Sequence, residues 1–271
     1  MQILLEQFKL SLLDRGMSDN TIKSYLASVS SYLNIYGEDI SQESLNCYKA
    51  YQEQHYRPQT VNLRIIAINR FLAFAGKSQL RLHLIKYQHA FFSDDIISYA
   101  DYLRFKSLLQ AEKEQKWYFI VWTLAATGVR ISELVQFKAE HIFNGSFDLR
   151  SKGNKYRRIY IPKRLQAELT LWLQKQNRLS GALFLNCDGM PISIRGISKG
   201  LERYASHYGL DKHQVHPHAF RHLFAKKFLE TKNDLSMLAD LLGHESLDTT
   251  KIYLRMTSQE QHDIINEIVE W

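Results

Sequence analysis

Six side chains suited to chemistry on a phosphate group occur in four short motifs, in the order TGVRISEL, SKGNKYR, HPHAFRH and LLGHESLDTTKIY. They are Arg130, Lys152, His218, Arg221, His244 and Tyr253. Two guanidinium groups suit a phosphodiester, because each can donate two parallel hydrogen bonds to phosphate oxygens. A tyrosine hydroxyl can act as a covalent nucleophile, although its ordinary pKa of about 10 means that it needs a base or a positive field. Histidine can accept that proton, and lysine can protonate a departing oxygen. The set predicts phosphoryl transfer through a phosphotyrosine, with no metal required.

Several of these residues also have a purely structural interpretation. Arg130 could form an ion pair with Glu133, and Lys152 and Lys155 could be exposed residues of a turn. Tyr253 is one of 15 tyrosines and, by itself, would be taken as a core residue. We assign Glu133 a supporting role, since a carboxylate there can orient a neighbouring cation. The sequence lacks a Walker-type phosphate loop, a Gly-x-Ser-x-Gly elbow and a His-Glu-x-x-His zinc signature, so the usual hydrolase motifs do not explain the set.

The histidines leave a second chemical interpretation open. His218 and His222 are four residues apart and share one face of a helix, and His216 and His244 could join them around a metal ion. The helix motif contains no carboxylate that could complete such a site. We therefore predict neither a metal nor a cofactor.

The elements that precede these motifs begin with four predicted helices in residues 1–77. Ser18 and Ser41 can cap the second and third helices, and Pro58 suits the first turn of the fourth. Gly16 ends the first apolar pattern and Gly76 ends the last. Helices with such short connections favour a compact bundle.

Residues 78–97 lack a helical period and predict a linker, after which a second domain should span 98–271. In that domain the apolar helix KWYFIVWTLAATG should end at Gly128, and residues 146–161 alternate like a hairpin with its turn at Gly153-Asn154. The other predicted helices span 98–112, 163–178, 195–208, 218–231, 234–242, 246–255 and 258–270. The fold class is therefore mainly α with a small antiparallel β-sheet.

Length and composition narrow the possible partners. The chain has 271 residues and a formal net charge of +7, and this length suggests two domains. The stretch 151–164 holds six basic residues and no acidic one, which accounts for almost the whole excess and predicts a phosphate-binding surface. Two cysteines exclude a disulfide framework. No apolar run resembles a signal peptide or approaches the roughly 18 residues of a membrane span, so we expect no membrane contact and a cytoplasmic protein.

The four motifs, taken together in order and spacing, resemble those of the tyrosine recombinases, or phage integrase family, and most closely its compact bacterial Xer-like or transposon-type integrases. The resemblance covers essentially the whole chain. It implies a helical core-binding domain over 1–77 and a mixed, mostly helical catalytic domain over 98–271. The segment 258–271 would then dock on a neighbouring protomer, or pack on its own domain. The implied function is site-specific DNA recombination without ATP or metal, for integration or excision of mobile DNA or for resolution of chromosome or plasmid multimers.

The same resemblance implies the central chemical steps. Arg130 and Arg221 would clamp the scissile phosphate, and Lys152 would protonate the departing 5′ oxygen. Tyr253 would attack, which leaves a 3′-phosphotyrosyl bond and a free 5′ hydroxyl. That hydroxyl, exchanged between duplexes, would reverse the step and rejoin the strands.

The resemblance also implies roles for the two remaining residues. His218 would act as acid and base toward the tyrosine, and His244 would hydrogen-bond the phosphate and help to assemble the site. Ser151 stands where the family commonly has glycine, and it should be tolerated at a strand end.

Double-stranded DNA is the implied partner, bound by a homotetramer on paired sites, with or without a related recombinase or accessory factor. The resemblance further implies a bacterial protein that associates with the nucleoid when it is bound to DNA. Basic residues that we expect to contact DNA are Lys155, Arg157, Arg158, Lys23, Arg64 and Arg70. Two alternatives remain: a type IB topoisomerase-like nicking-closing enzyme, which would act as a monomer, and a DNA-binding protein without catalysis. The complete set of six residues argues against the second.

Overall fold

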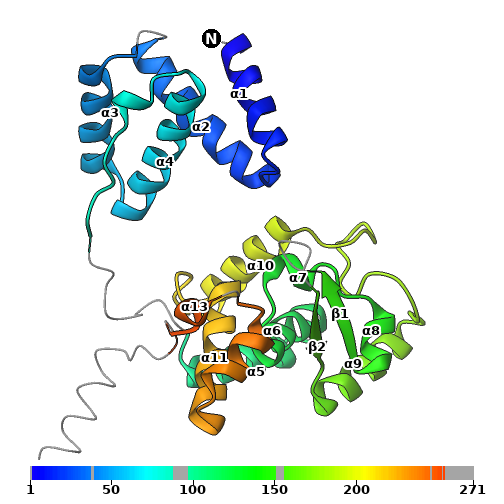
Figure 1. The fold of residues 1–271 in the computed structure, drawn as a ribbon. Helices are drawn as coiled ribbons and strands as arrows, with labels where there is room; N and C mark the ends of the chain where they lie inside the picture. The colour runs from blue at the N-terminus through cyan, green and yellow to red at the C-terminus, as the bar shows by residue number, and fades with distance from the viewer. Residues whose placement is uncertain are drawn as a thin grey trace, which may run out of the picture. The chain divides into compact units, whose positions relative to one another are not determined.

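The computed structural model describes residues 2–37, 40–87, 97–150, 156–244, 246–251 and 253. The chain divides into two compact units, Met1–His89 and Ala90–Trp271 (Figure 1). Both units are mainly helical, and the second also contains a two-stranded antiparallel sheet. The predicted fold class is therefore confirmed. Within the described residues, no helix is both long enough and apolar enough to span a lipid bilayer.

The first unit contains four helices and a short 3₁₀ helix. Their bounds are α1 Gln2–Asp14, α2 Asp19–Tyr36, α3 Gln42–His55, α4 Pro58–Phe74 and η1 Ser78–Leu80. The Ser18 hydroxyl accepts a hydrogen bond from the Thr21 N–H, and the Ser41 hydroxyl accepts one from the Ser44 N–H. Pro58 occupies the first turn of α4. The expected caps therefore begin the expected helices.

The core of the first unit forms where its four helices meet. Tyr32 from α2, Tyr48 from α3 and Phe71 from α4 are fully buried, and Phe8 from α1 packs edge-on against Phe71 with 5.3 Å between ring centroids. Edge-to-face contacts of this kind are favourable beyond the area that they bury. The first unit thus has a core of its own.

Residues 78–87, which the sequence places in the linker, run along α4 and belong to the first unit. The Asn69 side chain exchanges two hydrogen bonds with the Leu82 backbone, each of 2.9 Å. Seven residues earlier, the Asn62 side chain holds the Ile85 backbone in the same way, at 2.8 and 2.9 Å. The side chain of Leu82 is buried in the core. Of the predicted linker 78–97, residues 88–96 lie outside the described residues.

The second unit contains nine described helices and the sheet. The helices are α5 Tyr99–Ala111, α6 Gln115–Thr127, α7 Ile131–Leu134, α8 Ala139–Asn144, α9 Lys163–Lys175, α10 Ile194–His207, α11 Pro217–Lys232, α12 Leu235–Leu242 and α13 Leu247–Lys251. The sheet pairs β1 Ser146–Arg150 with β2 Tyr156–Tyr160 in antiparallel register, with Ser146 opposite Tyr160. The predicted turn at Gly153-Asn154 and the predicted helix 258–270 lie outside the described residues.

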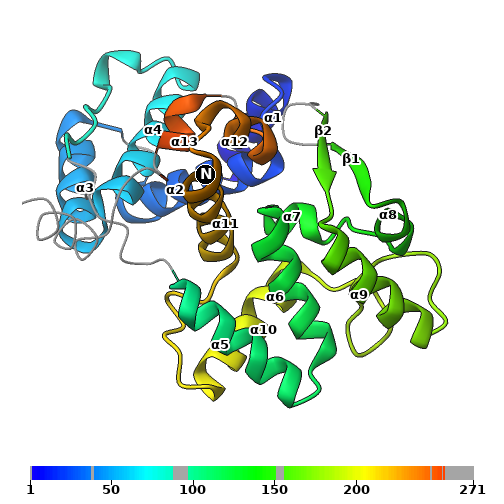
Figure 2. The ribbon, with the colours of Figure 1, turned by 90° about the horizontal axis from the view of Figure 1, so that it is seen from below.

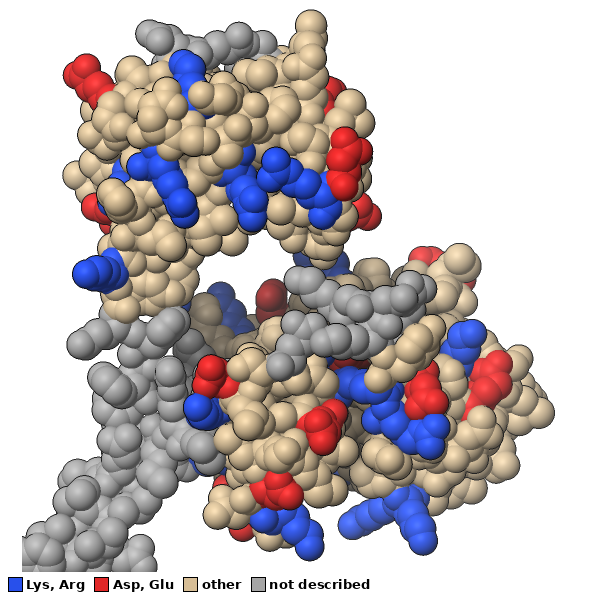
Figure 3. All heavy atoms as spheres, viewed as in Figure 1, with Lys and Arg blue, Asp and Glu red and all other residues tan. Residues whose placement is uncertain are grey.

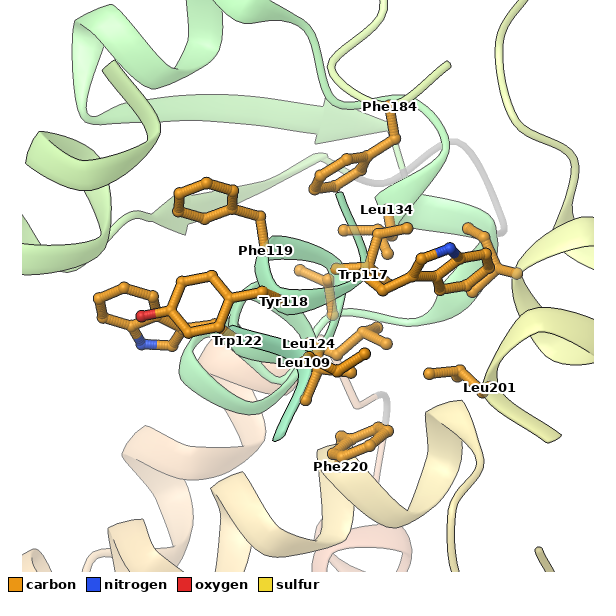
Figure 4. Packing of buried hydrophobic residues seen from close by; sticks show 14 of the residues in the cluster. Leu109, Trp117, Tyr118, Phe119, Trp122, Leu124, Leu134, Phe184, Leu201 and Phe220 are labelled. Atoms are coloured by element: carbon orange, nitrogen blue, oxygen red, sulfur yellow. The ribbon is translucent and has the colours of Figure 1, made fainter. Parts of the chain in front are cut away.

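Helix α6 lies at the centre of the second unit, with α5, α9 and α11 packed around it (Figure 2). Its apolar side chains, among them Trp117, Phe119 and Leu124, point outward in several directions into the core (Figure 4). Gly200 in α10 gives Trp117 its space, since a Cβ atom there would lie 1.7 Å from the indole ring. A helix that is apolar on all sides must be surrounded, and α6 therefore fixes the elements that carry the site.

Candidate active site

Three arginines meet at the C-terminal turn of α12. Arg157 Nη1 donates a hydrogen bond to the Leu241 carbonyl, and Arg221 Nη2 donates to the Leu242 carbonyl at 2.8 Å. Arg130 Nη2 donates to the next carbonyl, at Gly243, over 3.4 Å. The last carbonyls of a helix have no partner within it and carry the negative end of the helix dipole. The backbone oxygens of residues 241–243 therefore bind three positively charged side chains. We call this turn the arginine cradle.

Arg221 is the most deeply held of the three. It lies in α11, is only 2% exposed, and its Nη1 donates to the Gly128 carbonyl at the end of α6 over 2.7 Å. Burial, followed by the charge of Arg130, lowers the pKa of Arg221 to about 10, while interaction with Tyr253 opposes that shift. The group stays cationic at neutral pH. Its described hydrogen-bond acceptors are backbone carbonyls, the Tyr253 side chain and an imidazole, so no described carboxylate pairs with its charge.

Glycine at position 128 permits this arrangement. Gly128 ends α6 in the left-handed conformation, with φ of +61°. A Cβ atom there would lie 2.5 Å from Phe224 Cδ1 and 3.0 Å from Leu242 Cδ2. Both the backbone conformation and the close approach of α11 and α12 favour glycine.

Arg130 is held through Glu133, as the supporting role predicts. The Glu133 carboxylate accepts hydrogen bonds from the Arg130 backbone N–H at 2.7 Å and from Arg130 Nη1 at 3.2 Å. Its Oε2 also accepts from Arg157 Nη2 at 2.5 Å. Burial raises the pKa of Glu133, but the charge of Arg157 and the hydrogen bonds from both arginines outweigh it, so the pKa lies below its ordinary value. Glu133 therefore stays ionised, and the Arg130 side chain remains 33% exposed.

Tyr253 lies between two histidine rings. The ring of His222 meets it edge-on with 4.7 Å between centroids, and the ring of His244 stacks on it at 5.8 Å. Its hydroxyl is hydrogen-bonded to Arg221. The predicted nucleophile and the guanidinium of a predicted phosphate clamp are thus direct neighbours within one chain.

The hydrogen bonds of His244 assign its tautomer. Its Nε2 lies 2.8 Å from Arg221 Nη2 and its Nδ1 lies 2.8 Å from the hydroxyl of buried Thr250. A guanidinium can only donate, so Nε2 accepts and the proton resides on Nδ1. Burial, followed by the charges of Arg221 and Arg130, lowers the pKa of His244 to about 4. The ring is therefore neutral at physiological pH.

His218 begins the same helix face as Arg221. It lies in the first turn of α11 and is accessible at the surface. Partial withdrawal of the ring from water, followed by the charges of Arg221 and of His216, lowers its pKa. An accessible imidazole that is neutral at pH 7 can accept a proton.

The structure brings together five of the six predicted residues: Arg130, Arg221, His218, His244 and Tyr253. The sixth, Lys152, lies outside the described residues, as does Lys155. Among the described residues, no cluster of three or more His, Cys, Asp or Glu side chains could hold a metal ion.

Arg157 requires a correction. The sequence groups it with the residues that contact DNA, but its side chain is only 6% exposed and its guanidinium is bound to Glu133 and to the Leu241 carbonyl. The alternation along β2 contains the signal for this position, because Arg157 shares its face with buried Ile159 while Tyr156 and Arg158 point outward. The sequence also does not identify His222 as a neighbour of Tyr253. The only signal is that His222 follows His218 by four residues, which places both on one face of a helix.

Two family models match the chain. The phage integrase family matches residues 101–260, and the phage integrase N-terminal SAM-like domain matches residues 5–79. The chain is also similar to the tyrosine recombinase XerC of Lactobacillus delbrueckii subsp. bulgaricus, with 30% identity over 286 residues that cover 94% of this chain and 95% of the relative.

Two solved structures share the fold across nearly the whole chain. The Tn1549 transposon integrase in complex with transposon right end DNA has a TM-score of 0.74 at 17% identity and covers 98% of this chain and 99% of its own. A lambda integrase dimer bound to a core site has a TM-score of 0.73 at 16% identity, with 92% of this chain and 96% of that chain covered. The motifs, the meeting of the arginines with Tyr253 and the two family matches lead to one conclusion: the chain belongs to the phage integrase family of tyrosine recombinases, enzymes that exchange DNA strands.

Proposed function

We propose that this recombinase cleaves its DNA site with Tyr253 as nucleophile and with Arg130 and Arg221 on the scissile phosphate. The observation that supports this most directly is the position of Arg221, whose guanidinium is hydrogen-bonded to both Tyr253 and His244. A phosphate held by Arg221 would therefore lie beside the tyrosine hydroxyl. Preorganised cations at such a point stabilise the charge that develops in the transition state.

The reaction conserves the phosphodiester energy in a covalent link. The Tyr253 oxygen forms a bond to phosphorus as the bond to the 5′ oxygen breaks, and the DNA retains a 3′-phosphotyrosyl end. The phenol proton passes to His218 and the departing oxygen takes a proton from Lys152, so charge and atoms balance. Attack by a free 5′ hydroxyl on the phosphotyrosine reverses both transfers and joins the strands.

In this proposal His244 does more than hydrogen-bond the phosphate. In the free protein its Nε2 accepts from Arg221 and its Nδ1 donates to Thr250. This pair of hydrogen bonds connects α13, which precedes Tyr253, to the arginine cradle. His244 would thereby place the nucleophile, and would turn to the phosphate when DNA replaces part of this network.

Several surface cations extend the interaction beyond the scissile phosphate. Lys23 on α2 and Arg70 on α4 are exposed, and Arg64 on α4 lies over the ring of Tyr56 at 3.8 Å. In the space-filling view a band of Lys and Arg side chains crosses the visible face of the first unit (Figure 3). On β2, Arg158 is exposed and paired with Asp148 at 2.8 Å, an ion pair weak enough for a phosphate to replace it. We propose that these residues, together with Lys155, contact the phosphate backbone of the DNA.

We further propose a homotetramer on two paired sites, in which segment 258–271 docks on a neighbouring protomer. The comparison with the lambda integrase dimer on its core site supports assembly on DNA. Whether the reaction serves mobile DNA or multimer resolution, the chemistry is the same, and we place it at the nucleoid of a bacterial cytoplasm.

Covalent trapping tests the proposal and identifies the DNA site in the same experiment. Wild-type protein is mixed with fragmented DNA of its source, denatured with detergent, and the DNA that remains attached is sequenced. A nicked duplex that carries the recovered site then serves as a suicide substrate. The expected result is a covalent adduct with the wild type and none with Tyr253→Phe, while both bind the duplex equally.

A matched control removes a different hydroxyl. Tyr208→Phe loses a tyrosine oxygen in the same unit, one that donates to Glu112 at 2.9 Å, and it should form the adduct at the wild-type rate. Wild type and Tyr208→Phe should keep their activity in excess chelator. An adduct with Tyr253→Phe, or no adduct with the wild type, would refute the assignment. Relaxation of supercoiled DNA without a site preference would favour the topoisomerase-like alternative.

A further inference from the structure

One buried cation in the site has no role in the steps above. Arg157 on β2, one of the three arginines that bind the arginine cradle, has a side chain that is only 6% exposed. One end of its guanidinium binds Glu133 in α7, and the other binds the Leu241 carbonyl in α12. Its Nε is buried with no hydrogen-bond partner among the described residues. Burial of an unpaired guanidinium costs folding free energy, so the contacts that this side chain makes are part of what holds the fold together.

The path of the side chain explains a glycine in the fourth motif. Gly243 has a φ of +64°, and a Cβ atom there would lie 2.6 Å from Arg157 Cδ. The stem of Arg157 therefore crosses directly over the residue that precedes His244. Any side chain at 243 would have to displace either the stem or the end of α12.

Each contact of Arg157 is adjacent to a residue that the proposed chemistry uses. Glu133 also holds the backbone and the guanidinium of Arg130. The Leu241 carbonyl begins the same turn whose next carbonyls hold Arg221 and Arg130. In the sequence, β2 begins four residues after Lys152.

We propose that Arg157 is a positioning residue for strand cleavage, which joins β2 to α7 and to the arginine cradle and so fixes Arg130 and His244 relative to each other. The inference rests on the proposed function, because the orientation of Arg130 affects cleavage only if Arg130 binds the scissile phosphate. It also replaces the role that the sequence suggests for Arg157, since the buried side chain acts through Glu133 and the cradle.

The variant Arg157→Met keeps much of the stem and removes both connections. We expect the rate of covalent adduct formation at saturating suicide substrate to fall about 10- to 100-fold, because small misplacements of catalytic groups have effects of this size. The dissociation constant for the duplex and its salt dependence should stay at the wild-type values. Gly243→Ala, which crowds the stem, should lower the same rate in the same direction.

The matched control is Arg178→Met. Arg178 is a half-buried arginine of the same unit that donates to the Ala182 and Leu183 carbonyls, away from the site. Thermal unfolding of both variants corrects each rate for the folded fraction. In a Glu133→Gln background Arg157→Met should reduce the rate by a smaller factor, because residues that act through one another are not additive.

Amide hydrogen exchange gives a readout that does not depend on activity. The His244 N–H donates to the Ala239 carbonyl at 3.0 Å, and its exchange should accelerate in Arg157→Met but not in Arg178→Met. Equal exchange in both variants would overturn the proposal. So would weaker DNA binding with a salt slope reduced by about 1, the mark of a phosphate contact, or an unchanged cleavage rate. If the wild type forms no adduct at all, the proposed function fails, and the exchange comparison still decides whether Arg157 positions the cradle.

Discussion

At the scale of single residues, the site keeps a positive charge that no described carboxylate cancels. Arg221 donates to the carbonyls of Gly128 and Leu242 and to His244, whereas Glu133 pairs with Arg130 and Arg157. Backbone carbonyls orient a guanidinium but contribute only partial charges. An incoming phosphate would therefore meet a cation that is already held in place and still electrostatically available.

Arg221→Lys should retain the charge and lose the function. Lysine presents a single ammonium group, which cannot reach two carbonyls, His244 and a phosphate in the geometry of a planar guanidinium. We expect adduct formation to fall at least about 100-fold, similar to the loss of one preorganised transition-state donor. Single-turnover trapping measures the rate, and circular dichroism verifies the fold. A rate within tenfold of the wild type would contradict the geometric role.

The two histidines that flank Tyr253 should make the fold sensitive to mild acid. Burial comes first among the causes that lower the pKa of His222 and of His244 to about 4, and the neighbouring cations Arg221 and, for His244, Arg130 contribute. An unfolded histidine titrates near pH 6.5. Between these values the unfolded chain binds more protons, so stability is complete above about pH 6.5 and declines as the pH falls toward 4.

Melting temperatures at pH 7 and pH 5 measure this dependence. His222→Gln should show a smaller drop between the two pH values than the wild type. The exposed His213 of the same unit provides the control, and His213→Gln should retain the wild-type drop. An unchanged drop in His222→Gln would mean that other groups cause the acid sensitivity.

At the scale of elements, three helix ends form the site. The C-terminus of α6 holds Arg221, the C-terminus of α12 holds all three arginines, and the N-terminus of α11 carries His218. Gly128 lets these ends approach each other. The catalytic geometry is therefore a property of how α6, α11 and α12 pack, and it should respond to changes at that junction.

Gly128→Ala should destabilise the second unit more than Gly209→Ala. Both glycines are left-handed, with φ of +61° and +66°, but a Cβ at 209 meets nothing within 4 Å. Gly209→Ala therefore reports the backbone cost alone, about 1–2 kcal/mol. At Gly128 the contacts with Phe224 and Leu242 should add about 1–3 kcal/mol of overpacking. Urea denaturation of the two variants gives the difference, and equal losses would show that the junction can relax.

Local signals in the sequence predict most of these elements, and tertiary packing determines the rest. Ser18, Ser41 and Pro58 mark helix starts because caps act within one turn. Helices α7 and α8, of four and six residues, are too short to show a period. The four motifs identify the site, but no local pattern reveals that the arginines converge on α12, because those contacts join residues about 20 to 110 positions apart.

At the scale of the whole molecule, each unit has its own core among the described residues. The first is built from α1 to α4 and includes the segment that reaches Leu82. The second unit has a large core around α6 and a smaller apolar cluster between α11 and α12. The described site residues all come from the second unit. The first unit supplies a basic face (Figure 3) but none of the five described catalytic candidates.

A fragment of residues 1–89 should therefore fold by itself. It contains the complete core of α1 to α4, along with the two asparagines that fasten residues 82 and 85 to α4. We expect a helical circular dichroism spectrum and a cooperative thermal transition. A fragment that stops at residue 77 lacks buried Leu82 and should melt at a lower temperature. Equal melting temperatures would show that residues 78–87 add nothing to the unit.

The arginine cradle has a consequence for how such a sequence can change over time. Its acceptors are main-chain oxygens at 241–243, which every amino acid supplies. Replacement of Leu241 by another residue that fits the helix would leave that acceptor in place. Insertion or deletion of a single residue within α12 would instead rotate the carbonyls at its end by about 100° about the helix axis relative to the three guanidinium groups. Substitutions at position 241 should thus be tolerated, whereas changes in the length of α12 should not.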